Sequence, residues 1–200
     1  MRTPKTGTAK AQHTRQRIIE AAIRIIASQG IEKATTREIS KEAKVANGLV
    51  TRYLKSQDEL FTTVTQFIAA VAYNEIEAAP EELPAQEKIL WMCERNIDFF
   101  LNHPDYAKCF LLFYYYASIA PSIRALNAAF DKRAISRLET YLRQNLNTEE
   151  ELWPAAAGIH GQIVSSVYRY YTVPQTLSKE EYRLDFLNRC RWLIRLILRE

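Results

Sequence analysis

Glycine, proline and cysteine are scarce in this chain of 200 residues, with 5, 7 and 3 copies. Few glycines and prolines disfavour turn-rich β-sandwiches and barrels, and they exclude collagen-like or linker-dominated chains. The nearest pair of glycines, Gly158 and Gly161, forms neither a G-x-G-x-x-G nor a Walker sequence, so no Gly-rich phosphate loop is present. With 48% hydrophobic and 25% charged residues, the composition is otherwise that of an ordinary globular protein.

The sequence carries no sign of an oxidising or membrane environment. Cys93, Cys109 and Cys190 lie far apart, and three cysteines cannot all pair within one chain, so we expect buried free thiols. The amino terminus is charged but has no apolar segment behind it, unlike a signal peptide. The uncharged run 109–123, broken by Pro121, is shorter than the ~20 residues that a membrane span needs. These absences predict a cytoplasmic protein.

Positive charge is concentrated at one end of the chain. Residues 1–55 hold twelve Lys and Arg against four Asp and Glu, a net charge of +8. Because the whole chain carries +4, the remaining 145 residues carry −4. A basic end joined to a mildly acidic remainder indicates that the end meets a polyanion.

Helical periodicity runs through most of the sequence and predicts an all-α fold of about nine helices. In the basic end, we expect one helix from an N-cap at Thr14 to a stop at Gly30, and a short one from the capping box of Thr35 and Glu38. A second short helix is expected over 47–54. Ser56 and Glu59 form another capping box, from which a long helix should reach about residue 79. Further helices are expected over 85–102, 105–117, 121–145, 149–171 (capped by Asn147 and Thr148) and 178–199.

These elements divide the chain into three expected parts. Residues 1–13, which show no periodicity, would be a flexible basic arm. Residues 14–58 would form a helix-turn-helix DNA-binding domain, because two short helices joined by a tight turn lie among basic residues. The long helix would join this domain to residues 59–200, which we expect to form a ligand-binding and dimerisation domain.

The residue types of the basic end suit contact with DNA. Thr35 and Thr36 at a helix start offer hydroxyl and N–H groups to a phosphate. Asn47 at the start of the second short helix can bond adenine, and Arg37 or Arg52 can bond guanine, in the major groove. The simpler interpretation is that the basic residues only solvate a small helical bundle.

The stretch from residue 14 to 61 also resembles the DNA-binding domain of the TetR family of bacterial transcription regulators. The resemblance rests on Arg17-Ile18-Ile19, Ala21-Ala22, Gly30, Thr35-Thr36-Arg37-Glu38-Ile39, Ala43-Lys44-Val45-Ala46-Asn47-Gly48, Tyr53-Leu54, Ser56 and Leu60-Phe61. It implies an all-helical homodimer that binds a pseudo-palindromic operator, usually as a repressor. A small molecule in the larger carboxy-terminal domain would release the DNA.

By position, the resemblance implies that Arg37 and Asn47 read bases and that Thr36 and Tyr53 contact phosphate. The chain also departs from the family pattern. Lys44 stands where Gly is common, Ala46 where Ser often caps, Thr51 where Tyr binds phosphate, Leu54 where Phe is common, and Gln57 where Lys binds phosphate. We expect Lys44, Arg52 and Lys55 to compensate for the lost phosphate contacts. The full predicted DNA interface is Thr35, Thr36, Arg37, Lys44, Ala46, Asn47, Gly48, Leu49, Thr51, Arg52, Tyr53, Lys55 and Gln57.

The remainder of the chain is rich in aromatic residues, which suit a cavity for an apolar or aromatic inducer. The predicted ligand-binding residues are Trp91, Phe99, Phe110, Phe113, Tyr114, Phe130, His160 and Tyr168. For each of them, ordinary core packing is the competing interpretation, and His160 could equally be a core or interface histidine. We expect no cofactor and no metal site, because no His, Cys, Asp or Glu cluster has ligand spacing.

The last two predicted helices have apolar stripes wider than one core face needs. Gly158, Gly161, Ser165 and Ser166 would allow a second copy to approach closely, which predicts a homodimer through these helices. The alternative is that the stripes only close the core of a monomer.

Two other functions compete with a ligand-responsive repressor. The basic arm and the missing phosphate contacts also fit a sequence-neutral nucleic-acid-binding or protein-interaction module without an inducer. An all-α enzyme is disfavoured, because no G-x-S-x-G, Cys/His or Glu-x-x-His signature is present. Glu94 and Asp98, at i and i+4, are expected to lie on a solvated helix face.

Overall fold

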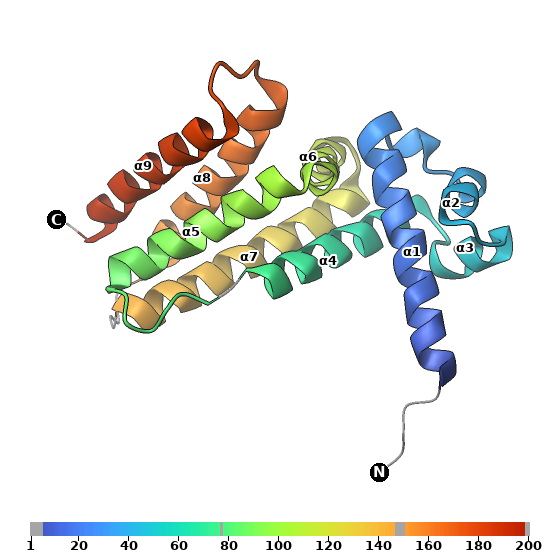
Figure 1. The fold of residues 1–200 in the computed structure, drawn as a ribbon, viewed down its shortest axis with the longest axis horizontal. Coiled ribbons are helices and arrows are strands. Elements are labelled where there is room, and N and C mark those ends of the chain that lie inside the picture. The colour runs from blue at the N-terminus through green and yellow to red at the C-terminus, as the bar shows by residue number, and fades with distance from the viewer. Residues whose placement is uncertain (1–5, 77, 147–150, 199–200) are drawn as a thin grey trace, which may run out of the picture.

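The computed structural model describes residues 6–76, 78–146 and 151–198, and all regular structure among them is helical. This confirms the predicted all-α fold with nine α-helices over the described residues (Figure 1). The elements are α1 (Thr6–Gln29), the 3₁₀ turn η1 (Ile31–Lys33), α2 (Thr36–Ala43), α3 (Asn47–Tyr53), α4 (Gln57–Glu75), α5 (Ala85–Asn102), α6 (Pro104–Ile119), α7 (Pro121–Leu146), α8 (Trp153–Thr172) and α9 (Lys179–Leu198). We call α1–α3 the head and α4–α9 the body.

Helix α1 begins earlier than the sequence predicted. Thr14 is not an N-cap, since its hydroxyl donates to the Lys10 carbonyl (2.9 Å) inside the helix, and the predicted flexible arm is wrong for residues 6–13. Alanine, lysine and glutamine in this stretch are good helix formers, so it can be helical without a buried face. Periodicity detects only faces that pack, and the side chains from residue 10 to 13 are exposed.

The other helix boundaries of the head follow the predicted signals. Gly30 ends α1 with φ +88°, a conformation that favours glycine. The Thr35 side chain accepts from the Glu38 N–H (3.2 Å), and Ser56 caps α4 by accepting from the Glu59 N–H (3.1 Å). Both N-caps that were predicted from capping boxes in this region are therefore confirmed.

The body boundaries differ from the prediction at two places. Helix α4 ends at Glu75 instead of reaching residue 79. Helix α8 begins at Trp153 instead of at residue 149, and its own first turn contains a proline. The caps predicted at Asn147 and Thr148 lie outside the described residues.

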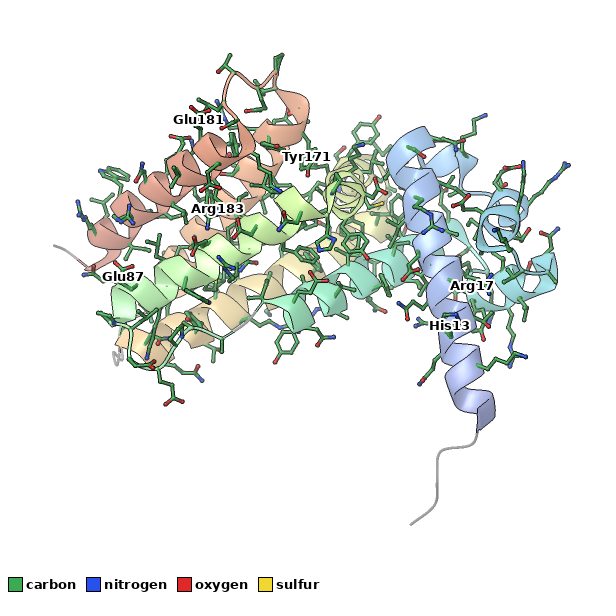
Figure 2. All side chains as sticks on the ribbon, in the orientation of Figure 1. His13, Arg17, Glu87, Tyr171, Glu181 and Arg183 are labelled. Atoms are coloured by element: carbon green, nitrogen blue, oxygen red, sulfur yellow. The ribbon has the colours of Figure 1, made fainter. Side chains whose placement is uncertain are left out.

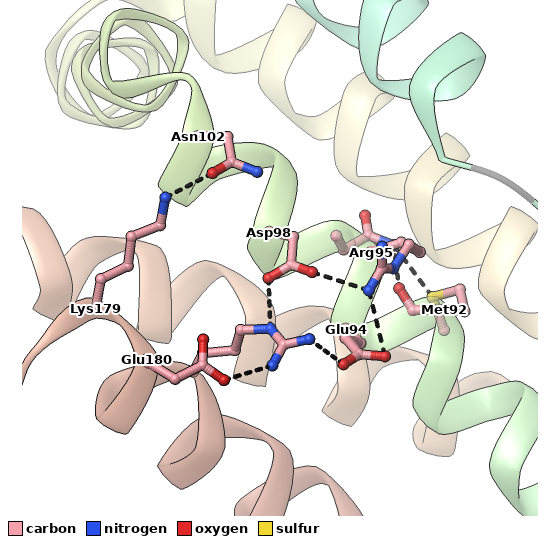
Figure 3. Close-up of polar contacts among 9 residues, drawn as sticks. Met92, Glu94, Arg95, Asp98, Asn102, Lys179 and Glu180 are labelled. Atoms are coloured by element: carbon pink, nitrogen blue, oxygen red, sulfur yellow. Dashed lines mark hydrogen bonds and ion pairs between the residues drawn. The ribbon is translucent and has the colours of Figure 1, made fainter.

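A charged network holds α9 against α5 (Figure 3). The Arg183 guanidinium on α9 donates to Asp98 Oδ1 (2.8 Å) and pairs with Glu94 on α5. Arg95 adds a contact of 3.1 Å to Asp98 Oδ2. The prediction that Glu94 and Asp98 lie on a solvated face is wrong, because their side chains are only 22% and 19% exposed. Helical spacing could not reveal a partner 85 residues away.

Helix α6 contacts both the start of α4 and the head. Phe61, near the start of α4, packs its ring 6.1 Å from that of Phe113 and 5.1 Å from that of Tyr116, both on α6. The Tyr116 hydroxyl also donates to the Glu32 carboxylate in η1. Helix α6 thus contacts the helix that leaves the head and the turn that precedes α2, so a movement of α6 reaches both.

The three cysteines are free and buried, as predicted. Burial, with a smaller effect of the Asp105 charge, raises the pKa of Cys109 to about 12, so this thiol stays protonated near neutral pH. None of the described helices is long and apolar enough to span a membrane.

Candidate DNA interface and body site

Helices α2 and α3 are joined by a tight turn whose geometry depends on two basic residues. Lys44 adopts a left-handed conformation (φ 52°), and the Val45 N–H donates to the Ser40 carbonyl (3.0 Å). Arg17 lies on α1, where Figure 2 labels it, and its guanidinium donates to the Ala43 carbonyl at 2.5 Å, which satisfies a backbone acceptor at the end of α2. In the sequence, Arg17 stood out only as part of the family resemblance, because its neighbouring residues do not show which carbonyl it contacts.

The left-handed conformation of Lys44 gives a prediction with two opposite effects. Lys44→Gly should raise the free energy of unfolding by about 1 kcal/mol, because glycine adopts this conformation without the steric penalty of a side chain. It should also weaken DNA binding, because a predicted phosphate contact is lost. Lys44→Ala is the matched control: it removes the same charge but keeps the strain. Chemical denaturation and a salt series of DNA binding test both; equal stability of the two variants would contradict the strain argument.

Most of the predicted DNA contacts lie on the surface of the head. Ten of the thirteen are exposed: Thr35, Arg37, Lys44, Ala46, Asn47, Gly48, Thr51, Arg52, Lys55 and Gln57. The other three, Thr36, Leu49 and Tyr53, are half-buried, and the last two pack against the core. Leu49 and Tyr53 therefore help to hold α3 in place as well as bordering the surface.

The side chains proposed to contact DNA differ in whether their polar atoms already form hydrogen bonds within the chain. The side-chain oxygen Oδ1 of Asn47 accepts a hydrogen bond from the Ser40 hydroxyl, so one of its two acceptor positions is already used. Thr35 already uses its hydroxyl oxygen as the cap of α2. Arg37 and Arg52 are exposed, and neither guanidinium forms a hydrogen bond or ion pair among the described contacts, so both are free to reach a base.

A groove of about 400 Å³ lies between the start of α2, the end of α3 and the start of α4. Its lining includes Thr35, Thr36, Lys55 and Gln57, four of the predicted contacts. Two helix amino termini open toward it, and backbone N–H groups at such termini favour anions. We propose that this groove holds a phosphate of the DNA backbone, with Lys55 supplying the charge that Gln57 lacks and offsetting the Glu32 carboxylate in the lining.

The comparisons agree with this geometry. A family model described as bacterial regulatory proteins of the tetR family matches residues 18–64, which include α2, α3 and their turn. The regulator BetI of Vibrio vulnificus is 23% identical over 93% of this chain and 96% of its own length. The DNA-binding end of the chain, residues 18–64, is a TetR-family domain.

Two further relatives show the range of the similarity. The transcriptional repressor NicS of Pseudomonas putida is 28% identical over 53% of this chain, and the match spans 51% of that repressor's length. A transcriptional regulator from Saccharomonospora viridis, solved in complex with choline, has the same fold with a TM-score of 0.70 at 18% identity, over 88% of this chain and 95% of that one. With its TetR-family domain, the chain is a DNA-binding transcriptional regulator.

In the body of this TetR-family regulator, five of the eight predicted ligand-binding residues lie together. The rings of Phe110, Phe113, Tyr114 and Phe130, which we call the aromatic cluster, join α6 to α7 with centroid distances of 5.0–6.4 Å. His160 on α8 contacts Asp131, the residue next to Phe130, at 3.3 Å. The cluster thus has one polar edge that reaches α8.

The other three predicted residues lie elsewhere. Phe99 packs on His103 and Tyr106 near the junction with the head, and Trp91 lies under the Arg95 guanidinium at 5.0 Å. Tyr168 is 54% exposed on the outer surface of α8, so it does not line the interior of one chain. Aromatic residues are common in any helical core, and composition alone could not separate these positions.

Asp131 is the site residue that the sequence reasoning missed. The Tyr114 hydroxyl donates to its Oδ1 atom (2.6 Å), and Asn127 Nδ2 lies 3.4 Å from Oδ2. Burial opposes ionisation of Asp131, but the hydrogen bonds from His160 and Tyr114 outweigh it and lower its pKa. Burial and the bond to Asp131 raise the pKa of Tyr114. A signal existed, because Asn127 and Asp131 are polar residues on the stripe of α7 that continues through Ile135.

Two hollows of the described part of the chain lie away from the aromatic cluster. One is the groove on the head, and the other, of about 270 Å³, lies between α1 and the α5–α6 corner. No three His, Cys, Asp or Glu side chains among the described residues are grouped to hold a metal ion.

The outer surface of α8 and α9 carries two glycines, which have no side chain, as well as exposed apolar residues. Gly158 and Gly161 face outward on α8, and Trp192 (64%) and Leu196 (56%) are exposed on α9. The prediction that Ser166 belongs to this surface is wrong: it is buried, and its carbonyl accepts from the Tyr182 hydroxyl.

Proposed function

We propose that this TetR-family regulator is a homodimeric repressor that binds a palindromic operator and is released from it by a small molecule bound in the body. The observation that carries this proposal is the continuous ring contact from Phe130 through Phe113 to Phe61 and Tyr116. Through these packed rings, a movement in the body can reach the segment before α2 and the helix α4 that follows α3.

The proposed mechanism is a change in the spacing of the two heads. A ligand between the rings of the aromatic cluster would displace Phe113 and with it Phe61, which lies five residues into α4. Two recognition helices enter successive major grooves only when they lie about 34–36 Å apart. A change of a few ångströms would remove the contacts of one half-site, so the ligand-bound dimer would leave the operator.

The relatives support the proposal in part. NicS is named a repressor, and the Saccharomonospora viridis regulator of the same fold binds choline. By position, we propose that the DNA-binding domain ends near residue 58, that α4–α9 form the ligand-binding and dimerisation domain, and that the dimer forms through α8 and α9.

A comparison of two DNA duplexes tests the proposed function. The full chain should bind DNA from the region upstream of its own gene at least about a thousandfold more tightly than a random duplex of equal length. Binding should weaken with salt, because phosphate contacts release counterions. Equal affinity for both duplexes would instead identify a sequence-neutral nucleic-acid-binding module, and no affinity for either would favour a protein-interaction module.

A further inference from the structure

One polar atom beside the aromatic cluster has no partner. The side-chain oxygen Oδ1 of Asn127 is buried and accepts no hydrogen bond from the described residues. Exchanging the amide nitrogen and oxygen does not resolve this, because it would turn an oxygen toward the Asp131 carboxylate, 3.4 Å from the present nitrogen. A buried acceptor without a donor is unfavourable, so this position calls for an N–H or O–H group.

The neighbouring carboxylate is also incompletely paired. The Oδ1 atom of Asp131 receives both the Tyr114 hydroxyl (2.6 Å) and the His160 ring nitrogen (3.3 Å). Its Oδ2 atom receives only the long contact from Asn127. Within the described part of the chain, no lysine or arginine forms an ion pair with Asp131. The free acceptor capacity of Asp131 therefore lies on the side of Asn127.

The surroundings add an apolar wall and a route to solvent. The rings of Phe110, Tyr114 and Phe130 lie next to this pair of acceptors, since Tyr114 bonds Asp131 and Phe130 precedes it in α7. The Asp131 side chain is 32% exposed, so a polar group can reach it from outside. An ionised carboxylate beside aromatic rings attracts cations.

We propose that the body site recognises a protonated organic amine. Its ammonium N–H groups would donate to Asp131 Oδ2 and Asn127 Oδ1, and its apolar part would lie between the rings of the aromatic cluster. This inference rests on the proposed ligand-responsive function and names the chemical class of that ligand.

The two acceptors exclude the neighbouring chemical classes. A neutral alcohol could donate to Asn127 but would bring no positive charge to the carboxylate, and an organic acid would be repelled by it. A quaternary ammonium carries the charge but has no N–H for the amide oxygen. A primary or secondary amine satisfies both groups, because donors that carry a charge form the stronger hydrogen bonds.

Matched pairs of small aromatic probes test the proposal by calorimetric titration of the full chain. The amines are benzylamine, 2-phenylethylamine and 4-phenylbutylamine, each compared with the alcohol of the same length. At least one amine should bind at least about tenfold more tightly than its alcohol. Binding of that amine should fall by a similar factor in Asp131→Asn and in Asn127→Leu. The control variant, Glu139→Gln, removes a carboxylate from the same helix and should bind the amine like the unmodified chain.

Each alternative result overturns part or all of the proposal. Failure of all three amines to bind, alcohols that bind as tightly as amines, or full affinity in Asp131→Asn would exclude an amine site. If choline binds as tightly as the best amine, and the Asn127→Leu variant keeps full affinity for that amine, the amide oxygen of Asn127 has no role in recognition.

Operator binding by the same preparations separates this inference from the proposed function. If an aromatic alcohol or acid releases the operator and no amine does, the repressor mechanism stands and the amine site is excluded. If the chain binds no operator, the proposed function itself fails, whatever the titrations show.

Discussion

Gly161→Arg should convert the protein from a dimer to a monomer and lower its affinity for the operator by at least about a thousandfold, toward the level of non-specific binding. An arginine on the outer surface of α8 would lie where we expect the second copy. A monomer reads only one half-site, so the contacts of the other are lost.

The expected loss of the dimer rests on the space that Gly161 leaves on the outer surface of α8. Glycine inside a helix is less favourable than alanine by about 1 kcal/mol, so its presence calls for a structural reason. A Cβ atom built on Gly161 meets no atom within 4 Å, and one on Gly158 meets only Leu193 at 4.0 Å, an ordinary contact. Nothing among the described residues of one chain therefore requires either glycine. A second backbone close to α8 would require both.

The isolated chain should tolerate the substitution, because the arginine meets open space and improves the helix propensity of α8. Sedimentation velocity gives the oligomeric state, and circular dichroism confirms that the helices remain. Ala125→Arg, on an exposed position of α7, adds the same charge away from α8 and α9 and should leave both the dimer and operator binding intact. A dimeric Gly161→Arg protein would place the interface elsewhere.

The parts of the fold that sequence reasoning predicted are those fixed by local chemistry. The Thr35 and Ser56 caps, the stop at Gly30 and the prolines that begin α6 and α7 act within one turn of chain, so their residue types define helix ends directly. The start of α1 was missed because residues 6–13 form a helix without burying a face.

The parts that could not be predicted depend on contacts between distant segments. Arg17 reaches a carbonyl 26 residues away, and Arg183 reaches acidic residues more than 80 positions earlier, as in the α5–α9 network of Figure 3. Asp131 gains its importance from Tyr114 and His160 on two other helices. A single sequence shows that such residues are polar but not which neighbours the fold brings to them. The inward position of Asp131 on α7 was the one available signal.

Arg37→Ala should reduce operator affinity by about tenfold to a hundredfold for each half-site, since a bidentate contact with guanine contributes about 1–3 kcal/mol. The dimer loses two such contacts, so the combined reduction should lie between about a hundredfold and ten-thousandfold. Affinity for random DNA should change much less, because base contacts and not phosphate contacts distinguish sequences.

Two further variants separate base reading from charge. Arg37→Lys keeps the positive charge but cannot reproduce the planar, bidentate geometry of the guanidinium, so it should lose most of the specificity that Arg37→Ala loses. Lys55→Ala, at the groove on the head, should instead weaken binding to operator and random DNA alike. It should lower the slope of log affinity against log salt by about one for each subunit. If Arg37→Lys binds the operator as tightly as the unmodified chain, Arg37 contacts phosphate, and base reading must pass to Asn47 or Arg52.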